Sequence, residues 1–422
     1  MHHFEYKNQE LYCEDVPLRR IADDVGTPVY VYSQATLVRH FNAFDQAFEG
    51  VPHLTCFSVK ANSNLALLRL FAGLGGGADI VSGGELFRAV KAGIPGDRIV
   101  FSGVGKTVEE IRAALDADIL MFNAESPQEL EILSDTAVSM GRKARIALRI
   151  NPDVDPKTHP YISTGLKKNK FGIPIEETLP IYRRAASLPG LEVVGLDCHI
   201  GSQLTEVSPF VDAVGRLKNL LERLKSEGLD IRYLDLGGGL GITYDTEEPP
   251  APGDYARAVR ETLDDDDITL ILEPGRVIVG NAGVLLARVL YTKTGATKHF
   301  VVTDGAMNDL MRPSLYDSYH AIKPVTLTDR ESVLVDIVGP ICESADFLAK
   351  DRIISRFEPG ELLVAMSAGA YGFTMSSNYN SRRRAAEVLV RGDQYYTVRR
   401  RETYEDLIRG EDIPVYLKNG DC

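Results

Sequence analysis

Lys60 is the side chain with the clearest chemical use in this sequence, because it ends an apolar run, FSVK, that is typical of a strand. Partial desolvation there would lower the pKa of the amine and make it a usable nucleophile toward a carbonyl compound. A strand-end lysine can also simply extend its amine into water along an apolar stem. Taken alone, Lys60 favours this second interpretation.

Two glycine-rich turns follow neighbouring strand candidates and could together hold a phosphate. One is the triple glycine at 237–239, and the other is EPGR at 273–276. Glycines let bare backbone N–H groups approach an anion, and Arg276 adds a fixed cation. A triple glycine can equally mark only a tight turn, so the pair of turns is compatible with either interpretation.

Two further residues suit a flat nitrogen heterocycle. Glu273 could keep a pyridine nitrogen protonated, which turns the ring into an electron sink. His199, in CHIGSQ, could stack on such a ring or transfer protons. The ordinary alternatives are a helix N-cap or salt bridge for Glu273 and a hydrogen-bonded structural histidine for His199.

The second half of the chain adds a thiol, a cation and two phenols. Cys342 lies in VGPICESAD, where neighbouring acids would raise its thiol pKa, so it suits a proton donor better than a nucleophile. A buried, inert cysteine is the alternative. Arg312 and Tyr316 lie in MRPSLYDSYH and Tyr371 in GAYG, and each could simply be a surface residue.

Eight short apolar runs alternate with helical patterns and would position the first group of residues. Alternation of this kind predicts βαβ units, a parallel sheet and, with eight strands, a (β/α)8 barrel. Active sites of such barrels lie at the carboxyl ends of the strands, where Lys60, Asp79, His199, the triple glycine and Glu273 all fall. The runs are 54–60, 77–82, 98–103, 119–124, 145–150, 193–200, 233–239 and 270–275.

The residue pattern changes after the eighth run, from alternating strand and helix candidates to a series of strand candidates. A barrel over residues 36–278 is predicted, followed by a β-sandwich or barrel-like domain of antiparallel strands formed by 279–422 and 1–35, the latter with a strand at 28–33. The polar stretch 151–172 interrupts the barrel pattern. A stretch of this length is either disordered or a functional lid, and its glycines and lysines suit a lid over an anionic site.

Composition excludes several classes of partner. A net charge of −13 over 422 residues disfavours nucleic acid and anionic membrane surfaces. The five cysteines form no CxxC pair, which predicts no metal or redox motif and fits a reducing cytoplasm. Neither a signal peptide nor a membrane span is predicted.

Considered together, the motifs resemble those of one enzyme class. The sequence is similar to the alanine racemase-like (fold type III) pyridoxal-phosphate decarboxylases and, within them, to the diaminopimelate decarboxylase family. The motifs occur in family order across nearly the whole chain, and each is weak alone. They are FSVKAN, SGGE, HIGSQ, GGG, EPGR, RPSLYDSYH, GPICESAD and GAYG with a following YN.

This resemblance implies pyridoxal 5'-phosphate as cofactor, no metal, and decarboxylation of meso-2,6-diaminopimelate to L-lysine and CO2. It implies that Lys60 forms the covalent link to the cofactor and that Cys342, donated by the partner subunit of a homodimer, is the proton donor, with His199 as a further catalytic residue. The implied cofactor-binding residues are Lys60, Asp79, His199, Ser202, Gly238, Gly239, Glu273, Gly275, Arg276 and Tyr371. The implied substrate-binding residues are Arg276, Arg312, Tyr316, Glu343 and Tyr371.

Three alternatives remain open. One is a decarboxylase of the same class that acts on ornithine, arginine, carboxynorspermidine or a carrier-bound acid. Ornithine, for example, lacks the far carboxylate that Arg312 would bind, so Arg312 discriminates between these substrates. Another is an amino-acid racemase, which would need a tyrosine base in place of the Cys342 motif. The third is a non-enzymatic homologue that binds a partner.

Overall fold

The structure is a computed structural model that describes residues 2–154, 170–265, 267–295 and 298–418. The chain forms two compact units. The first, here called the barrel unit, contains residues 1–3, Ser33–Gly283 and Met366–Thr374. The second, the β unit, contains Phe4–Tyr32, Val284–Ala365 and Met375–Cys422.

Eight parallel strands close into a ring in the barrel unit, which confirms the barrel predicted from the eight apolar runs. Each strand pairs with the next, and the last, β13, pairs back with the first, β5. A short strand, β10 (Ile173–Pro174), adds to β9 outside the ring. The ring strands are β5 (His53–Ser58), β6 (Gly77–Ile80), β7 (Ile99–Phe101), β8 (Met121–Ala124), β9 (Ala144–Asn151), β11 (Leu191–Asp197), β12 (Tyr233–Asp235) and β13 (Thr269–Leu272).

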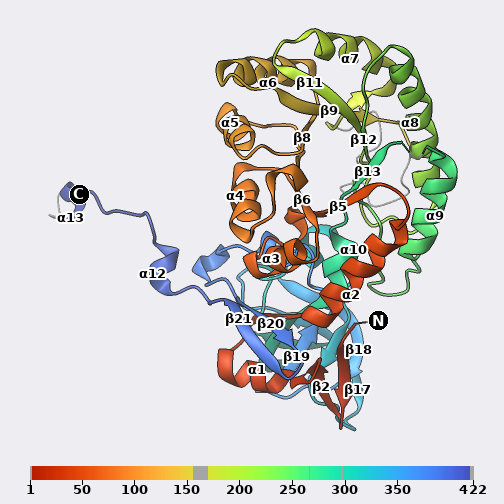
Figure 1. Ribbon diagram of the computed structural model, residues 1–422. Coiled ribbons are helices and arrows are strands. Elements are labelled where there is room, and N and C mark those ends of the chain that lie inside the picture. Colours follow the sequence, from red (N-terminus) through yellow and green to blue (C-terminus); the bar gives the residue numbers. More distant parts are fainter. Residues whose placement is uncertain (1, 155–169, 266, 296–297, 419–422) are drawn as a thin grey trace. The chain divides into compact units, whose positions relative to one another are not determined.

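Helices cover the outside of this ring, as Figure 1 shows. Apolar side chains pack into a buried cluster of this unit, among them Val100, Met121 and Ile271, which are fully buried. Several helices start at a serine or threonine whose oxygen accepts a hydrogen bond from the helix's third residue, as at Ser82 and Ser126. The covering helices are α2 (Gln34–Asp45), α3 (Leu65–Gly73), α4 (Gly83–Ala92), α5 (Val108–Asp116), α6 (Pro127–Ser139), α7 (Thr178–Ser187), α8 (Ser208–Ser226) and α9 (Pro252–Leu263).

Most of the predicted lid, residues 155–169, lies outside the described residues. The two residues that follow the described Lys170 contact the barrel interior. The Phe171 ring lies 4.8 Å from the Arg149 guanidinium, and the Gly172 N–H donates to Glu125 Oε2 at 3.0 Å. The carboxyl-terminal end of the polar stretch is therefore attached to β8 and β9.

The β unit contains a mixed sheet in the order β18-β17-β15-β14-β4-β20-β21, with β19 and β16 paired beside β14. The predicted strand at 28–33 is confirmed as β4 (Val29–Ser33). A separate antiparallel sheet contains β1 (Phe4–Lys7), β2 (Glu10–Cys13) and β3 (Val16–Pro17). The other strands are β14 (Gly283–Thr294), β15 (His299–Thr303), β16 (Ile322–Pro324), β17 (Ser332–Val338), β18 (Phe347–Ser355), β19 (Leu362–Ala365), β20 (Ala386–Arg391) and β21 (Gln394–Arg399).

One strand pair in this sheet departs from the antiparallel prediction. β15 and β17 run parallel. The chain between them contains α11 (Arg312–Tyr316) and β16, so it is long enough for the crossover that a parallel pair requires. Other pairs of this sheet, such as β14 with β15 and β20 with β21, are antiparallel as predicted.

The segment Met366–Thr374 follows β19 and belongs to the barrel unit. The Tyr371 N–H donates to the Ala61 carbonyl at 2.8 Å, and Asn62 Nδ2 donates to the Gly369 carbonyl at 3.0 Å. Both partners directly follow Lys60. Within the described helices, none is long and apolar enough to cross a membrane.

Candidate active site

Lys60 lies at the carboxyl end of β5, in the short 3-10 helix η2 (Val59–Ala61). Its Nζ lies 3.0 Å from Asp79 Oδ2, at the end of β6. Ser58 Oγ donates to the same carboxylate oxygen at 2.9 Å. The two neighbouring strand ends thus place an amine against a fully buried carboxylate.

The expected lowering of the Lys60 pKa is wrong for the amine in this arrangement. Burial does push the pKa of Lys60 down, but Asp79, Glu273 and Tyr371 together outweigh it and raise the pKa above its ordinary value. The prediction from the sequence considered only the desolvation of Lys60, and not the carboxylates that the fold brings close to its amine. Lys60 is therefore an ammonium group until its amine reacts with a carbonyl compound.

Glu273 follows β13 and is 4% exposed. Its Oε1 accepts a hydrogen bond from Ser102 Oγ at 3.4 Å. Burial raises the pKa of Glu273 well above its ordinary value, and Asp235 and the other nearby carboxyl groups raise it further, against the opposing effect of Lys60. This acid would ionise readily only beside an additional cation, and a protonated ring nitrogen is such a cation.

His199 follows β11 and is held by the glycine turn of the next strand. The Gly238 N–H donates to His199 Nδ1 at 3.2 Å. Burial lowers the pKa of His199 well below its ordinary value, and Lys60 and Arg149 lower it further. The ring is therefore neutral and carries its proton on Nε2, because Nδ1 is an acceptor.

The triple glycine could not be replaced by residues with side chains without moving the site. Gly237 has a φ of +62°, and its N–H donates to Asp235 Oδ1 at 2.9 Å. A Cβ on Gly238 would lie 2.2 Å from the Glu273 carbonyl oxygen. The close approach of this turn to the end of β13 therefore depends on glycine.

Arg276 begins the short helix α10 (Arg276–Val279), directly after Gly275, and is 6% exposed. Its guanidinium donates to Tyr244 Oη at 2.6 Å and to Ser202 Oγ at 3.2 Å. It also lies 4.9 Å from the centre of the Tyr371 ring. Tyr371 has a φ of +55°, a strained conformation for an aromatic residue. Arg276 thus contacts Ser202 and Tyr371, two of the other residues predicted to surround a phosphate.

The other predicted site residues lie in the β unit. Arg312, in α11, is buried, and its guanidinium contacts His320 Nε2 at 3.0 Å and Ser318 Oγ at 3.3 Å. Tyr316 ends the same short helix and is partly exposed.

Cys342 and Glu343 lie in the loop between β17 and β18. Cys342 is exposed, which excludes the alternative of a buried, inert thiol within this chain. Its backbone N–H donates to Asn380 Oδ1 at 3.1 Å. Tyr379 Oη donates to Glu343 Oε2 at 2.6 Å, so the tyrosine and asparagine of the YN motif hold this loop.

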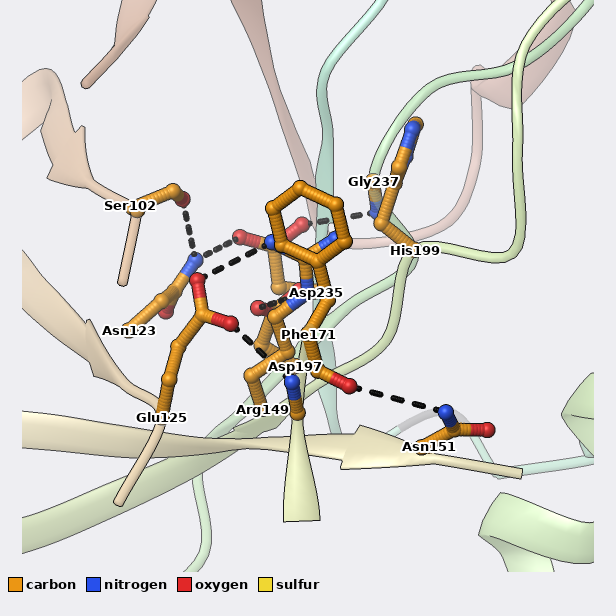
Figure 2. Close-up of polar contacts among 12 residues, drawn as sticks. Ser102, Asn123, Glu125, Arg149, Asn151, Phe171, Asp197, His199, Asp235 and Gly237 are labelled. Atoms are coloured by element: carbon orange, nitrogen blue, oxygen red, sulfur yellow. Dashed lines mark hydrogen bonds and ion pairs between the residues drawn. The ribbon is translucent and has the colours of Figure 1, made fainter. Parts of the chain in front are cut away.

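Sequence reasoning missed a polar network inside the barrel, which Figure 2 shows. Asn123 Nδ2 donates to Asp235 Oδ2 at 2.9 Å and to Ser102 Oγ at 3.0 Å. Arg149 pairs with Glu125 at 3.1 Å. A signal was present, since these side chains lie within or directly after apolar strand runs, where an inward-facing polar group needs a reason.

Comparison with known proteins identifies the family. Residues 34–280 match the family model described as "Pyridoxal-dependent decarboxylase, pyridoxal binding domain". A diaminopimelate decarboxylase from Pseudomonas aeruginosa is 56% identical over 410 residues, which are 97% of this chain and 99% of that protein. One from Aquifex aeolicus is 52% identical, over 96% of each chain.

Solved structures agree. A diaminopimelate decarboxylase from Helicobacter pylori, complexed with L-lysine, superposes with a TM-score of 0.90 at 43% identity and covers 96% of this chain and 100% of its own. The enzyme from M. jannaschii, also in complex with L-lysine, gives 0.94 at 40% identity, with 99% and 100% covered. The chain therefore belongs to the pyridoxal-dependent decarboxylases and, within them, to the diaminopimelate decarboxylase family.

The residues of the barrel unit fit the family's cofactor. Within the described part of the chain, Asp79 Oδ1 and Asn123 Oδ1 are buried without a hydrogen-bond partner, so the interior has polar capacity left for a ligand. The buried carboxyl groups favour a cationic ring, and Arg276 and Ser202 supply the donors that a phosphate requires. Lys60 and Glu273 therefore suit the two reactive ends of pyridoxal phosphate.

Glu273→Gln tests the charge balance in cofactor-free protein. A raised pKa means that folded Glu273 keeps a proton that the unfolded chain releases, so its stabilising effect is lost as pH rises from its ordinary 4.5 toward the raised value. Gln cannot ionise. Relative to wild type, the variant should therefore gain ~1.4 kcal/mol in unfolding free energy per pH unit across this window. Urea unfolding at several pH values measures it, and parallel curves would contradict the raised pKa.

Proposed function

We propose that this protein catalyses the pyridoxal-phosphate-dependent decarboxylation of meso-2,6-diaminopimelate to L-lysine and CO2 in the cytoplasm. The observation that carries the proposal is the convergence of Lys60 and Glu273 on one end of the barrel, together with Arg276 and Ser202, which offer donors for a phosphate. The names of its relatives, at more than half identity over nearly the full chain, point to the same reaction.

When bound, pyridoxal phosphate supplies an electron sink for the electron pair left behind by the departing carboxylate. Lys60 would hold the cofactor aldehyde, and Asp79 would orient its amine. Glu273 would place a carboxylate next to the ring nitrogen. His199, which is neutral and flat, would pack against the ring. Support for these roles comes from the contacts and charges of the barrel unit described above.

The phosphate contacts fall to a second set of residues, which offer backbone N–H groups or hydrogen-bond donors after β11, β12 and β13 and in the segment Met366–Thr374. Arg276 supplies the fixed charge, and its contacts with Tyr244 and Tyr371 hold the guanidinium in place. An anchored phosphate keeps the reacting atoms in register with Lys60. The set contains Ser202, Gly238, Gly239, Gly275, Arg276 and Tyr371.

The β unit supplies substrate recognition and the final proton. Cys342 donates a proton to the α-carbon after CO2 has left, which fixes the outcome as decarboxylation. Arg312 binds the far carboxylate of the substrate, and Glu343 binds its far ammonium, with Tyr316, Arg276 and Tyr371 as further contacts. Cys342 comes from the partner subunit, so the active protein is at least a symmetric homodimer.

The direct test is turnover. Incubation of the protein with meso-diaminopimelate and pyridoxal phosphate should yield L-lysine and CO2 in equal amounts. Lys60→Ala should lower turnover by about 100-fold or more, the scale lost with a group that takes part in the chemistry. Chromatography of the amino acids and trapping of CO2 measure both products. A racemised substrate without CO2 release would instead identify a racemase.

Arg312→Ala tests the choice of substrate. Loss of a charge-assisted contact to the far carboxylate should lower kcat/KM for diaminopimelate about 10- to 100-fold. Arg356→Ala is the matched control, because Arg356 is an exposed arginine of the same unit, paired with Glu331. If Arg312→Ala turns over diaminopimelate as wild type does, the substrate is another amino acid of the class.

The shared site can be tested by mixing two inactive variants. Lys60→Ala and Cys342→Ala each remove one half of every active site. Subunit exchange would create heterodimers with one complete site, and random exchange should restore about a quarter of wild-type activity. Activity is measured before and after mixing under conditions that permit exchange. No recovery, with exchange verified by mass spectrometry, would place Lys60 and Cys342 of one site in the same chain.

A further inference from the structure

Two carboxyl groups inside the barrel are close enough to share a hydrogen bond. Asp235, the last residue of β12, and Glu273, directly after β13, interact through their side chains. Asp235 is fully buried and Glu273 nearly so. Two ionised carboxylates have no proton to donate, so a hydrogen bond between them requires that one be protonated.

The hydrogen bonds around the pair indicate which group carries the proton. Both oxygens of Asp235 already accept: Oδ1 from the Gly237 N–H at 2.9 Å, and Oδ2 from Asn123 Nδ2 at 2.9 Å. Donors of this kind stabilise the ionised form. The Glu273 carboxyl group accepts from Ser102 Oγ, at the longer distance of 3.4 Å. Asp235 thus has the stronger set of hydrogen-bond donors and is the anion, and Glu273 is the protonated acid.

The charged groups that face Glu273 from the surrounding strands support the same assignment. Negative charge comes from Asp79 on β6 and Asp235 on β12. Asp197 on β11 is a third carboxyl group near Glu273, and burial and Asp235 raise its own pKa well above its ordinary value. Positive charge comes from Lys60, which Asp79 already pairs at 3.0 Å, and from Arg149 on β9, which pairs with Glu125. Neither cation is hydrogen-bonded to Glu273 in the described structure, so no cation there replaces its proton.

We propose that Asp235 and Glu273 share a single proton that resides on Glu273, and that this proton is delivered to the ring nitrogen when the cofactor binds. The inference rests on the proposed function and adds Asp235, Asn123 and Ser102 to it as positioning residues. In the transfer, the Glu273 O–H bond breaks and an N–H bond forms on the ring. The products are a ring cation and a Glu273 carboxylate, so charge is conserved.

The transfer lowers the electrostatic repulsion among the carboxyl groups of the site and also activates the ring. A ring cation between Glu273 and the other carboxyl groups offsets the repulsion that had kept Glu273 protonated. Asp235 stays ionised throughout, because its two donors do not change. The role of Asn123 is to hold Asp235 in this state, and Ser102 keeps the Glu273 carboxyl turned toward Asp235.

Infrared difference spectroscopy on the full-length protein tests the shared proton without any turnover. The spectrum of cofactor-free protein is compared with that after addition of pyridoxal phosphate. Wild type should lose the carbonyl stretch of one protonated carboxylic acid when the cofactor binds. Glu273→Gln should lack this change, and Asp235→Asn should show a smaller one, because Asp235 is one of the charges that keep Glu273 protonated. Asp309→Asn is the matched control, since Asp309 is an equally buried aspartate that belongs to the β unit; it should retain the change.

Calorimetry gives a second, independent measurement. Titration of pyridoxal phosphate into cofactor-free protein, in buffers of different ionisation enthalpy, counts the protons taken from solvent. Near neutral pH, Asp235→Asn should take up more protons from solvent than wild type, because without the Asp235 charge less of its Glu273 is protonated before the cofactor binds. Equal counts in wild type and Asp235→Asn, or an equal change in Asp309→Asn, would overturn the proposal.

The wild-type measurement alone decides the matter if Asp235→Asn does not fold. Wild-type protein that shows no loss of an acid carbonyl stretch on binding the cofactor contradicts the shared proton. Turnover of meso-diaminopimelate is assayed on the same preparation. Active protein without the infrared change would contradict only the proton shared by Asp235 and Glu273. Protein that binds the cofactor but releases no CO2 would contradict the proposed function.

Discussion

The crowding of buried carboxyl groups at one end of the barrel is the constraint on which the rest of the site depends. Four strands each deliver one of them, and none is more than 4% exposed. Burial makes each negative charge costly, and their proximity adds to the cost. Lys60 and Arg149 offset only part of it. The site is thereby prepared for a cationic ring, and its charge balance is complete only with that ring in place. The four groups are Asp79, Asp197, Asp235 and Glu273.

The barrel tolerates this arrangement because its polar and apolar parts are separated along the strands. Within the ring, Val100, Met121 and Ile271 form a fully buried apolar layer. The charged groups begin where each strand ends, and the backbone N–H groups of the loops and the side chains of neighbouring strands bind them. Glycines at 237–239 let one such loop come close to the next strand, and its backbone N–H groups donate hydrogen bonds to Asp235 and His199.

Much of this organisation could be predicted from the sequence. Eight apolar runs gave the eight ring strands, and the run at 28–33 gave β4. Lys60, Asp79, His199 and Glu273 were each singled out because they end such a run. The pKa of Lys60 was predicted in the wrong direction, because the carboxylates that raise it come from β6 and β13, which are distant in sequence. The same applies to Asn123 and Asp235, whose importance arises only from their contact across the ring. The limits of the two domains and the roles of the site residues stay predictions.

The return of Met366–Thr374 to the barrel unit constrains how this protein can be divided. A fragment that ended near Gly283 would contain every ring strand and Lys60. It would nevertheless lack the Tyr371 N–H that binds the Ala61 carbonyl and the Gly369 carbonyl that binds the Asn62 amide. Arg276 would also lose its contact with the Tyr371 ring. The barrel is thus completed by a piece of chain that is synthesised some eighty residues after its last helix. Gene fission, or the transplantation of the barrel onto an unrelated second domain, would have to preserve that late segment.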